Sequence, residues 1–199
     1  MTATNTNAIW TDRLMQRPDV FPHQLNLVND HVLLAELSAA DINAASFLDQ
    51  RVLKQTTQGN WVPWQLVADS IGNDSGHKPV GFIFHVGHCG STLLSRLISF
   101  AQNTQSLREP LPLRVLAQDL ADSHEGRSFL SLRERRDRVG KLLALWARGA
   151  EQTVIKATSI CTDLLPELHV VQANTRSIFI YNPPETHIAT LLAGQNALV

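Results

Sequence analysis

The sequence predicts an α/β fold in which helices cover both faces of a parallel sheet, preceded by a small N-terminal extension. The apolar run from Val80 to Val86, with a proline before it and a glycine after it, has the pattern of a strand buried on both faces. From there onward, strand-like and helix-like segments alternate, which is typical of a three-layer arrangement. A polar, glycine-containing stretch at 71–78 indicates a linker. We therefore expect an extension over residues 1–78 and an α/β body over residues 79–199.

The composition is that of an ordinary globular protein. The chain has 199 residues, of which 44% are hydrophobic and 18% charged, and its net charge of −1 is unlike that of a basic nucleic-acid-binding protein. No apolar run has the length of a membrane span, and residues 1–10 lack a signal-peptide pattern. Cys89 and Cys161 indicate neither a disulfide framework nor a cysteine-based metal site. We expect a cytoplasmic protein that needs no metal and binds neither nucleic acid nor membranes; a homodimer is left open.

The extension is expected to contain one strand and short helices. Residues 1–20 suggest a loosely held arm with a short helix over 10–16, and residues 32–37 suggest a strand. Ser38 is a favourable N-cap for a helix from Ala39 to about Lys54. A further short helix, introduced by Trp61 and Trp64, is expected to end near residue 70, with both tryptophans used for packing.

The body is expected to alternate strands and helices. Strand patterns occur at 80–86, 106–108, 153–157 and 176–181. Helical patterns occur from 91 onward, at 113–121, 131–149 and 162–169, and in a last helix opened near residue 185 by two prolines. We expect the arginine cluster over 133–138 to be a solvated helix face. His85, inside the first strand, is expected to be a core histidine with satisfied hydrogen bonds.

A loop of small residues follows the first body strand and leads into a helix. Helix N-termini present backbone N–H groups that lack partners, and the helix dipole favours an anion there. Ser91 and Thr92 add hydroxyl donors. We therefore predict a phosphate or sulfate site, with a plain capped turn as the alternative; its residues are Gly87, His88, Cys89, Gly90, Ser91 and Thr92.

The loop lacks the lysine that nucleoside-triphosphate-binding loops have, which restricts the kinds of anion-binding loop that it can be. The nucleoside-triphosphate loop has the pattern G-x-x-x-x-G-K-[ST], in which the lysine reaches the outer phosphates. Here Gly90 takes the second glycine position and Ser91 the lysine position, so the ammonium used by ATPases and kinases is absent. The loop instead resembles the 5′-phosphosulfate loop of sulfotransferases, P-K-S-G-T-T or P-R-S-G-T-T, with His88 at the basic position. The resemblance implies a P-loop-NTPase-like sheet topology and 3′-phosphoadenylyl sulfate as co-substrate.

Further segments resemble this family in the same order along the chain. In tyrosylprotein-type sulfotransferases, a glutamate follows the loop glycine at about the interval of Glu109 and acts as the base toward the acceptor. The family also has a lysine after a later strand, which Lys156 resembles. Its 3′-phosphate motif resembles the segment at 180–190, with Asn182 at the arginine position and Thr190 at the serine position.

The resemblance covers roughly residues 80–192 and implies sulfonyl transfer to a hydroxyl or amine of a small molecule or peptide. Glu109 would be the general base, and Lys156 and His88 would stabilise the group in transfer. The histidine replaces lysine or arginine, and Asn182 replaces arginine, which removes a bidentate phosphate contact. Family members usually continue further, so whether the body is complete at its C-terminal end is left open.

Other interpretations of these residues stay open. The chain can be a P-loop nucleotide kinase or NTPase with a degenerate loop, or a non-catalytic module that binds an anion or nucleotide. Glu109 can be a surface carboxylate and Lys156 a solvated lysine at a strand end. Cys89 can be a packing residue or a reactive thiol at the helix N-terminus, and Asn182 and Thr190 can be ordinary turn and helix residues.

Overall fold

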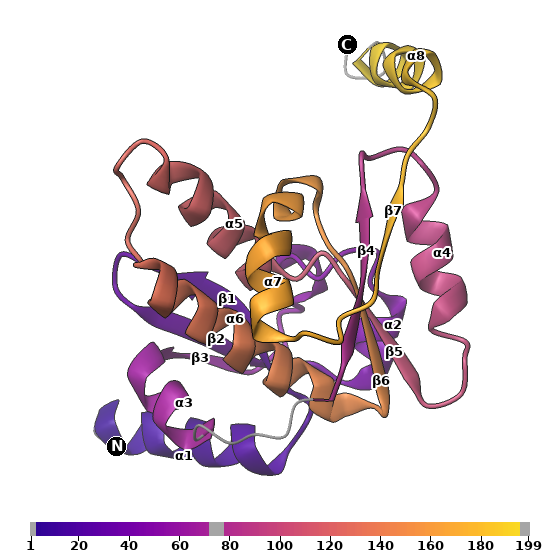
Figure 1. The fold of residues 1–199 in the computed structure, drawn as a ribbon. Coiled ribbons are helices and arrows are strands. Elements are labelled where there is room, and N and C mark those ends of the chain that lie inside the picture. The colour runs from indigo at the N-terminus through magenta and orange to yellow at the C-terminus, as the bar shows by residue number, and fades with distance from the viewer. Residues whose placement is uncertain (1–2, 72–77, 196–199) are drawn as a thin grey trace.

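A parallel sheet of four strands forms the centre of the body. The computed structural model describes residues 3–71 and 78–195, and Figure 1 shows its fold. The strands are arranged in the order β5-β6-β4-β7 and pair in parallel throughout; they are β4 (Val80–His85), β5 (Thr104–Arg108), β6 (Gln152–Lys156) and β7 (Ser177–Ile180). The four predicted body strands are therefore present, with ends shifted by one or two residues.

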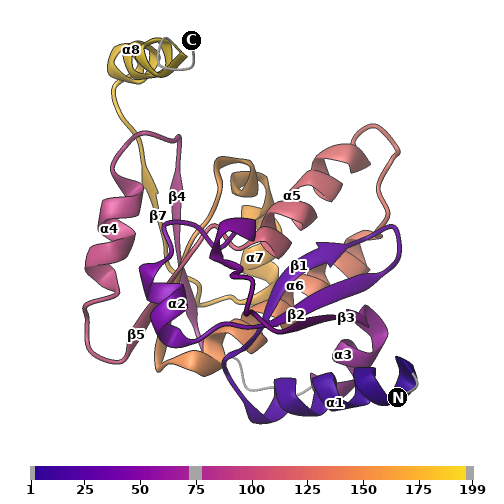
Figure 2. The same ribbon diagram turned by 180° about the vertical axis from the view of Figure 1, so that it is seen from behind.

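Helices flank this sheet, as the alternating pattern predicted. Helix α4 (Ser91–Ile98) lies on one side of the sheet, and α6 (Leu132–Trp146) and α7 (Leu165–Val171) lie on the other (Figures 1 and 2). Helix α5 (Leu111–Ser123) packs against the 3₁₀ helix η3 (Ser159–Leu164). The α/β class is confirmed, and the arrangement is compatible with a three-layer fold.

The N-terminal part contains an antiparallel sheet that the sequence only partly predicted. Its order is β1-β2-β3, with β1 (Val20–Asn26), β2 (His31–Glu36) and β3 (Gly59–Pro63). Only β2 was predicted, because Pro22 interrupts the first strand and a proline ends the third. A register shift between Pro22 and Gln24 accommodates that interruption.

Residues 3–20 do not form a loosely held arm. Helix α1 spans Ala3–Gln16, and its Trp10 and Leu14 side chains are buried in the hydrophobic core. Helix α3 (Trp64–Ile71) follows β3 and packs against α1. Residues 72–77, most of the predicted linker, lie outside the described part of the chain.

The helix predicted over residues 39–54 is wrong beyond its first turns. Helix α2 covers only Ala39–Ala44, followed by the 3₁₀ helix η1 (Gln50–Val52). The buried guanidinium of Arg108 donates hydrogen bonds of 2.7–2.8 Å to three carbonyl oxygens at the end of α2, those of Ile42, Asn43 and Ala45. These carbonyls are satisfied from β5 rather than by a continuing helix, so the chain is free to turn toward the sheet.

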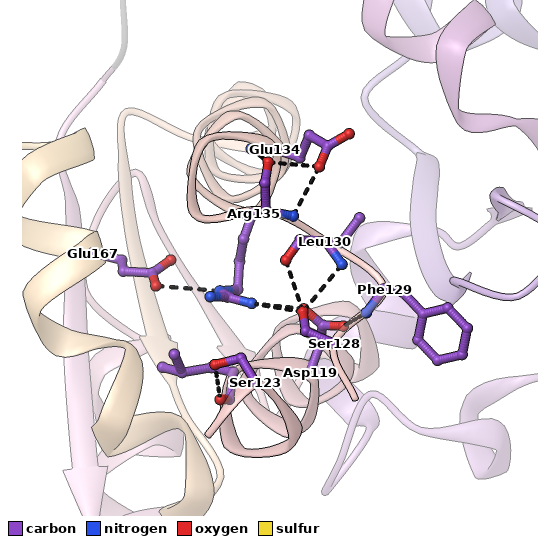
Figure 3. A network of polar contacts seen from close by, with 10 residues as sticks. Asp119, Ser123, Ser128, Phe129, Leu130, Glu134, Arg135 and Glu167 are labelled. Atoms are coloured by element: carbon purple, nitrogen blue, oxygen red, sulfur yellow. Dashed lines mark hydrogen bonds and ion pairs between the residues drawn. The ribbon is translucent and has the colours of Figure 1, made fainter. Parts of the chain in front are cut away.

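The arginine cluster of α6 is not simply a solvated face. Arg135 is buried and donates to Asp119 of α5 at 2.6 Å and to Glu167 of α7 at 3.2 Å (Figure 3). Arg138 is also buried, pairs with Asp30 at 2.6 Å and lies over the Trp64 ring. The expectation fails because carboxylates from other elements converge on this helix, which only the fold brings about.

The remaining elements complete the body. The 3₁₀ helix η2 (Ala147–Gly149) extends α6, and α8 (Pro184–Gln195) begins at a proline, as expected for a first turn. Helix α8 stands away from the rest of the body, beyond β7 (Figures 1 and 2).

Trp146 of α6 stacks on Phe21 of β1 and donates to the Pro22 carbonyl at 3.3 Å, so one hydrophobic core joins the N-terminal sheet to the body.

Candidate functional site

The carboxyl ends of β4 and β6 lie at a switch point of the sheet. The chain leaves β4 through α4 to reach β5, beyond β6, and it leaves β6 through α7 to reach β7, on the other side of β4. Ile83 is in register with Lys156, which in turn is in register with Arg108. Ligands of open α/β sheets bind where neighbouring strands connect in opposite directions. The predicted site residues that follow these strands therefore share one edge.

The loop after β4 has an unusual backbone conformation. Gly87 and Gly90 have φ of +83°, and His88 has φ of +48°, so three of its residues are left-handed. Gly90 is the N-cap of α4, and no side chain caps this terminus. Within the described residues, no acceptor binds the backbone N–H groups of Cys89, Gly90 or Ser91. The loop therefore offers several N–H donors together at a helix N-terminus.

The side chains of the loop differ in whether their polar groups already make hydrogen bonds within the protein. Among the residues described, the hydroxyls of Ser91 and Thr92 have no hydrogen-bond partner, although Ser91 is buried. The Cys89 thiol donates to the Ile180 carbonyl at 3.4 Å, and His88 is exposed. The two hydroxyls are thus available to a ligand, whereas the thiol is used to hold the loop against β7.

Lys156 and Glu109 form an ion pair at this edge. The Lys156 ammonium donates to Oε1 of Glu109, and the Lys156 side chain is only 2% exposed. The Glu109 backbone N–H donates to the Lys156 carbonyl at 2.7 Å. The structure therefore brings together the two residues that the sequence placed 47 positions apart.

Glu109 is held in an unusual backbone conformation and in its charged form. Its φ of +55° is left-handed, which costs a non-glycine residue about 1–2 kcal/mol and is concentrated at functional sites. Burial raises the pKa of its carboxyl, but contacts with His85 and Lys156 outweigh burial and hold the pKa below its ordinary value. Oε2 makes no hydrogen bond to a described residue, so this oxygen is open to a substrate.

His85 belongs to this cluster, although the sequence suggested only a core histidine. Its Nδ1 accepts a hydrogen bond of 2.9 Å from the Gly87 backbone N–H. Its Nε2 lies 3.6 Å from Oε1 of Glu109, and among the described residues it has no hydrogen-bond partner. The histidine is buried, as predicted, but its hydrogen bonds are not all satisfied. The signal in the sequence was its place near the end of the predicted strand, just before the loop.

Phe47 is a second site residue that the sequence did not predict. It lies in the turn after α2, and the Lys156 ammonium is 5.2 Å from its ring centroid. The backbone N–H of the next residue, Leu48, donates to the Arg108 carbonyl at 2.7 Å, which fixes this turn beside β5. An aromatic face beside a buried ammonium offers a favourable cation–π contact. The same ring lines a cavity of about 350 Å³ with Ser46, Arg51 and neighbouring residues.

The residues expected at a 3′-phosphate are engaged elsewhere. The Asn182 amide donates to the His88 carbonyl at 2.9 Å and so braces the loop. The Thr190 hydroxyl donates to the Thr186 carbonyl of its own helix at 2.8 Å. Because α8 projects from the body, the structure does not bring Thr190 into the cluster around Glu109.

Comparisons with known proteins do not assign the chain to a family. A scan against protein-family models, a search of curated proteins and a search of solved structures each found no match for the chain. Over residues 3–71 and 78–195, no helix is both long and apolar enough to cross a bilayer. In that same part of the chain, no group of three or more His, Cys, Asp or Glu residues is arranged to hold a metal ion.

Proposed function

We propose that the protein is a sulfotransferase that moves a sulfonyl group from 3′-phosphoadenylyl sulfate to a hydroxyl or amine of an acceptor. One observation carries the proposal: the Lys156–Glu109 pair lies at the same sheet edge as the anion loop and is linked to it by His85. An anion held by loop N–H groups would have an ammonium and a carboxylate close by. This combination suits in-line transfer between two oxygen atoms.

Each group has a distinct role in the proposed step. Oε2 of Glu109 takes the proton of the acceptor hydroxyl as the acceptor oxygen forms its bond to sulfur. The bond from sulfur to the 5′-phosphate oxygen breaks, and the leaving group is adenosine 3′,5′-bisphosphate. The negative charge on that oxygen is stabilised by the loop N–H groups, by the hydroxyls of Ser91 and Thr92, and by Lys156.

The topology supports a P-loop-like assignment. The first strand of the parallel sheet, β4, lies between the third and fourth strands in sequence, and it is the strand that leads into the anion loop. The loop lacks the lysine of nucleoside triphosphatases, which disfavours a kinase or NTPase.

A non-catalytic anion-binding module is the second candidate. It is favoured by Asn182 and Thr190, whose side chains are used within the protein rather than left for a 3′-phosphate. In this case the loop would bind an anion, but Glu109 would serve only to neutralise Lys156.

Calorimetric titration with adenosine 3′,5′-bisphosphate tests the proposal. We expect the wild type to bind it and to bind ATP with magnesium more weakly. Gly90→Val should abolish binding, because a β-branched residue does not tolerate a left-handed backbone. Glu109→Gln should retain binding but lose transfer of labelled sulfate to a panel of alcohols and amines. Absence of bisphosphate binding by the wild type would reject the proposal, and binding without transfer to any acceptor would favour the module.

A further inference from the structure

His85 connects the anion loop to the carboxylate–ammonium pair through its two ring nitrogens. Nδ1 accepts from the Gly87 N–H at 2.9 Å, and Nε2 faces Oε1 of Glu109 at 3.6 Å. The ring is more than nine-tenths buried, and solvent does not reach Nε2. The ring is thus placed between the loop and the carboxylate.

The hydrogen bond from Gly87 decides the tautomer of the neutral ring. A nitrogen that accepts a hydrogen bond carries no proton, so in neutral imidazole the proton is on the other nitrogen. His85 therefore carries its proton on Nε2, directed toward Glu109. Neither nitrogen then has a free lone pair for a substrate proton, which excludes the neutral ring as the general base.

We propose that His85 is a positioning residue that holds the anion loop and the Glu109 carboxylate in fixed relative positions. The proposal rests on the proposed function. Its Nδ1 fixes the start of the loop at Gly87. Its Nε2 lies 3.6 Å from Oε1 of Glu109, the oxygen that accepts the hydrogen bond from Lys156, so that Oε2 is the oxygen presented to the acceptor. Fixed second contacts of this kind keep reacting groups within the narrow range of productive geometry.

Two variants separate the two contacts of the ring. His85→Asn places an amide oxygen near the former Nδ1, so it can keep the Gly87 contact but removes the polar N–H that lies near Oε1 of Glu109. His85→Gln places an amide N–H near the former Nε2, so it can keep the Glu109 contact but gives up the acceptor for Gly87. The two replacements are similar in size and polarity, so each is the control for the other.

The first measurement is made on the wild type and needs no ligand. The ¹⁵N shifts of His85 in histidine-labelled protein should report a protonated Nε2 and an unprotonated Nδ1. The ¹³C shift of the Glu109 carboxyl, followed with pH, should give a higher apparent pKa in His85→Asn than in His85→Gln, because only glutamine keeps a polar N–H near Oε1 in addition to Lys156.

Ligand binding then tests the loop contact. Adenosine 3′,5′-bisphosphate should bind His85→Asn within about threefold of the wild type and His85→Gln about tenfold more weakly, the effect of losing one hydrogen bond. An Nδ1-protonated ring in the wild type, or two variants that titrate and bind alike, would overturn the proposal. If the wild type binds no bisphosphate, the proposed function fails, while the tautomer and the Glu109 titration still decide the positioning role.

Discussion

Glu109 and Lys156 are joined twice, once through side chains and once through the backbone. The ammonium of Lys156 donates to the Glu109 carboxylate, and the Glu109 N–H donates to the Lys156 carbonyl at 2.7 Å. The backbone bond continues the β5–β6 pairing by one residue. It therefore holds the left-handed backbone of Glu109 in place, so that the pairing of β5 with β6 fixes the position of the Glu109 side chain.

Removing the ammonium should destabilise the fold. Lys156→Met leaves the largely buried Glu109 carboxylate without its partner, so we expect a loss of about 3 kcal/mol in the free energy of unfolding at pH 7, measured with urea. The double variant with Glu109→Gln should recover part of that loss. Lys54→Met is the matched control, because its pair with Asp41 is exposed, and it should change stability by less than about 1 kcal/mol. Equal losses in the two lysine variants would contradict this account.

The same pair predicts a pH dependence on the acid side. The pKa of Glu109 in the folded protein lies below its ordinary value of 4.5, so the unfolded chain takes up the proton first as the pH falls. The stabilisation is complete above the unfolded pKa and is lost as the pH falls through the folded pKa. Urea unfolding at a series of pH values below 5 should show this loss in the wild type, and Glu109→Gln should lack that component.

Two glycines with left-handed backbones, Gly90 and Gly126, allow effects on stability to be distinguished from effects on ligand binding. At both Gly90 and Gly126 a β-carbon would meet no atom within 4 Å, so the cost of alanine is conformational, about 1–2 kcal/mol at each position. Gly90→Asn should cost less, because asparagine tolerates this backbone. Thermal unfolding should show similar losses for Gly90→Ala and Gly126→Ala, whereas only the former should weaken bisphosphate binding. Weaker binding by both would locate the effect outside the loop.

His23 should make stability fall in mild acid. The residue is fully buried on β1, and within the described part of the chain neither ring nitrogen has a hydrogen-bond partner. Burial lowers its pKa from the ordinary value of 6.5, and the nearby Asp49 offsets this only in part. Below pH about 6.5 the unfolded chain binds a proton that the folded protein does not, so stability decreases until the folded pKa is reached.

A leucine substitution tests the role of His23. Unfolding free energies from pH 8 to pH 5 should decline less steeply in His23→Leu than in the wild type. At pH 8 the variant should also gain about 1 kcal/mol, because unsatisfied polar atoms are removed. His169→Gln, at an exposed histidine, should leave the slope unchanged. Parallel curves for the wild type and His23→Leu would show that another group titrates.

Arg135 should be among the most sensitive positions outside the site. Arg135→Met leaves the Asp119 and Glu167 carboxylates buried without a cation, so we expect a loss of about 3–5 kcal/mol (Figure 3). Arg133→Met, two residues earlier on the exposed side of α6, should change stability by no more than about 0.5 kcal/mol. Chemical denaturation of both variants measures the difference, and a small effect at Arg135 would mean that the carboxylates find other partners.

Local sequence patterns were sufficient to predict those elements whose structure depends only on residues adjacent in the chain. The apolar run at β4, the glycine loop and the amphipathic helix after it are encoded by adjacent residues, and the structure has each of them. Strand β1 was missed because Pro22 conflicts with a regular ladder, and tertiary pairing with β2 resolves that conflict through a register shift. Helix α2 was extended too far because its end depends on Arg108, more than sixty residues away.

The residues of the candidate site also fall into those that the sequence predicts and those that depend on tertiary packing. The loop residues, Glu109 and Lys156 could be identified from the sequence, because each lies near or just after the end of a predicted strand and such ends converge in a parallel sheet. The place of His85 between loop and carboxylate, and of Phe47 beside the ammonium, depends on side-chain directions that no local pattern contains.

The α/β class, the body strands and the glycine turn after β4 follow from the order of residues along the chain, since hydrophobic periodicity and glycine positions act over a few residues. Which polar groups meet depends instead on how the elements pack together. This packing buried Arg135 between two carboxylates, directed Asn182 to the loop backbone, and joined Lys156 to Glu109. Polar and charged groups that lose contact with water cost free energy unless they find partners, and those partners come from whichever elements the sheet brings alongside.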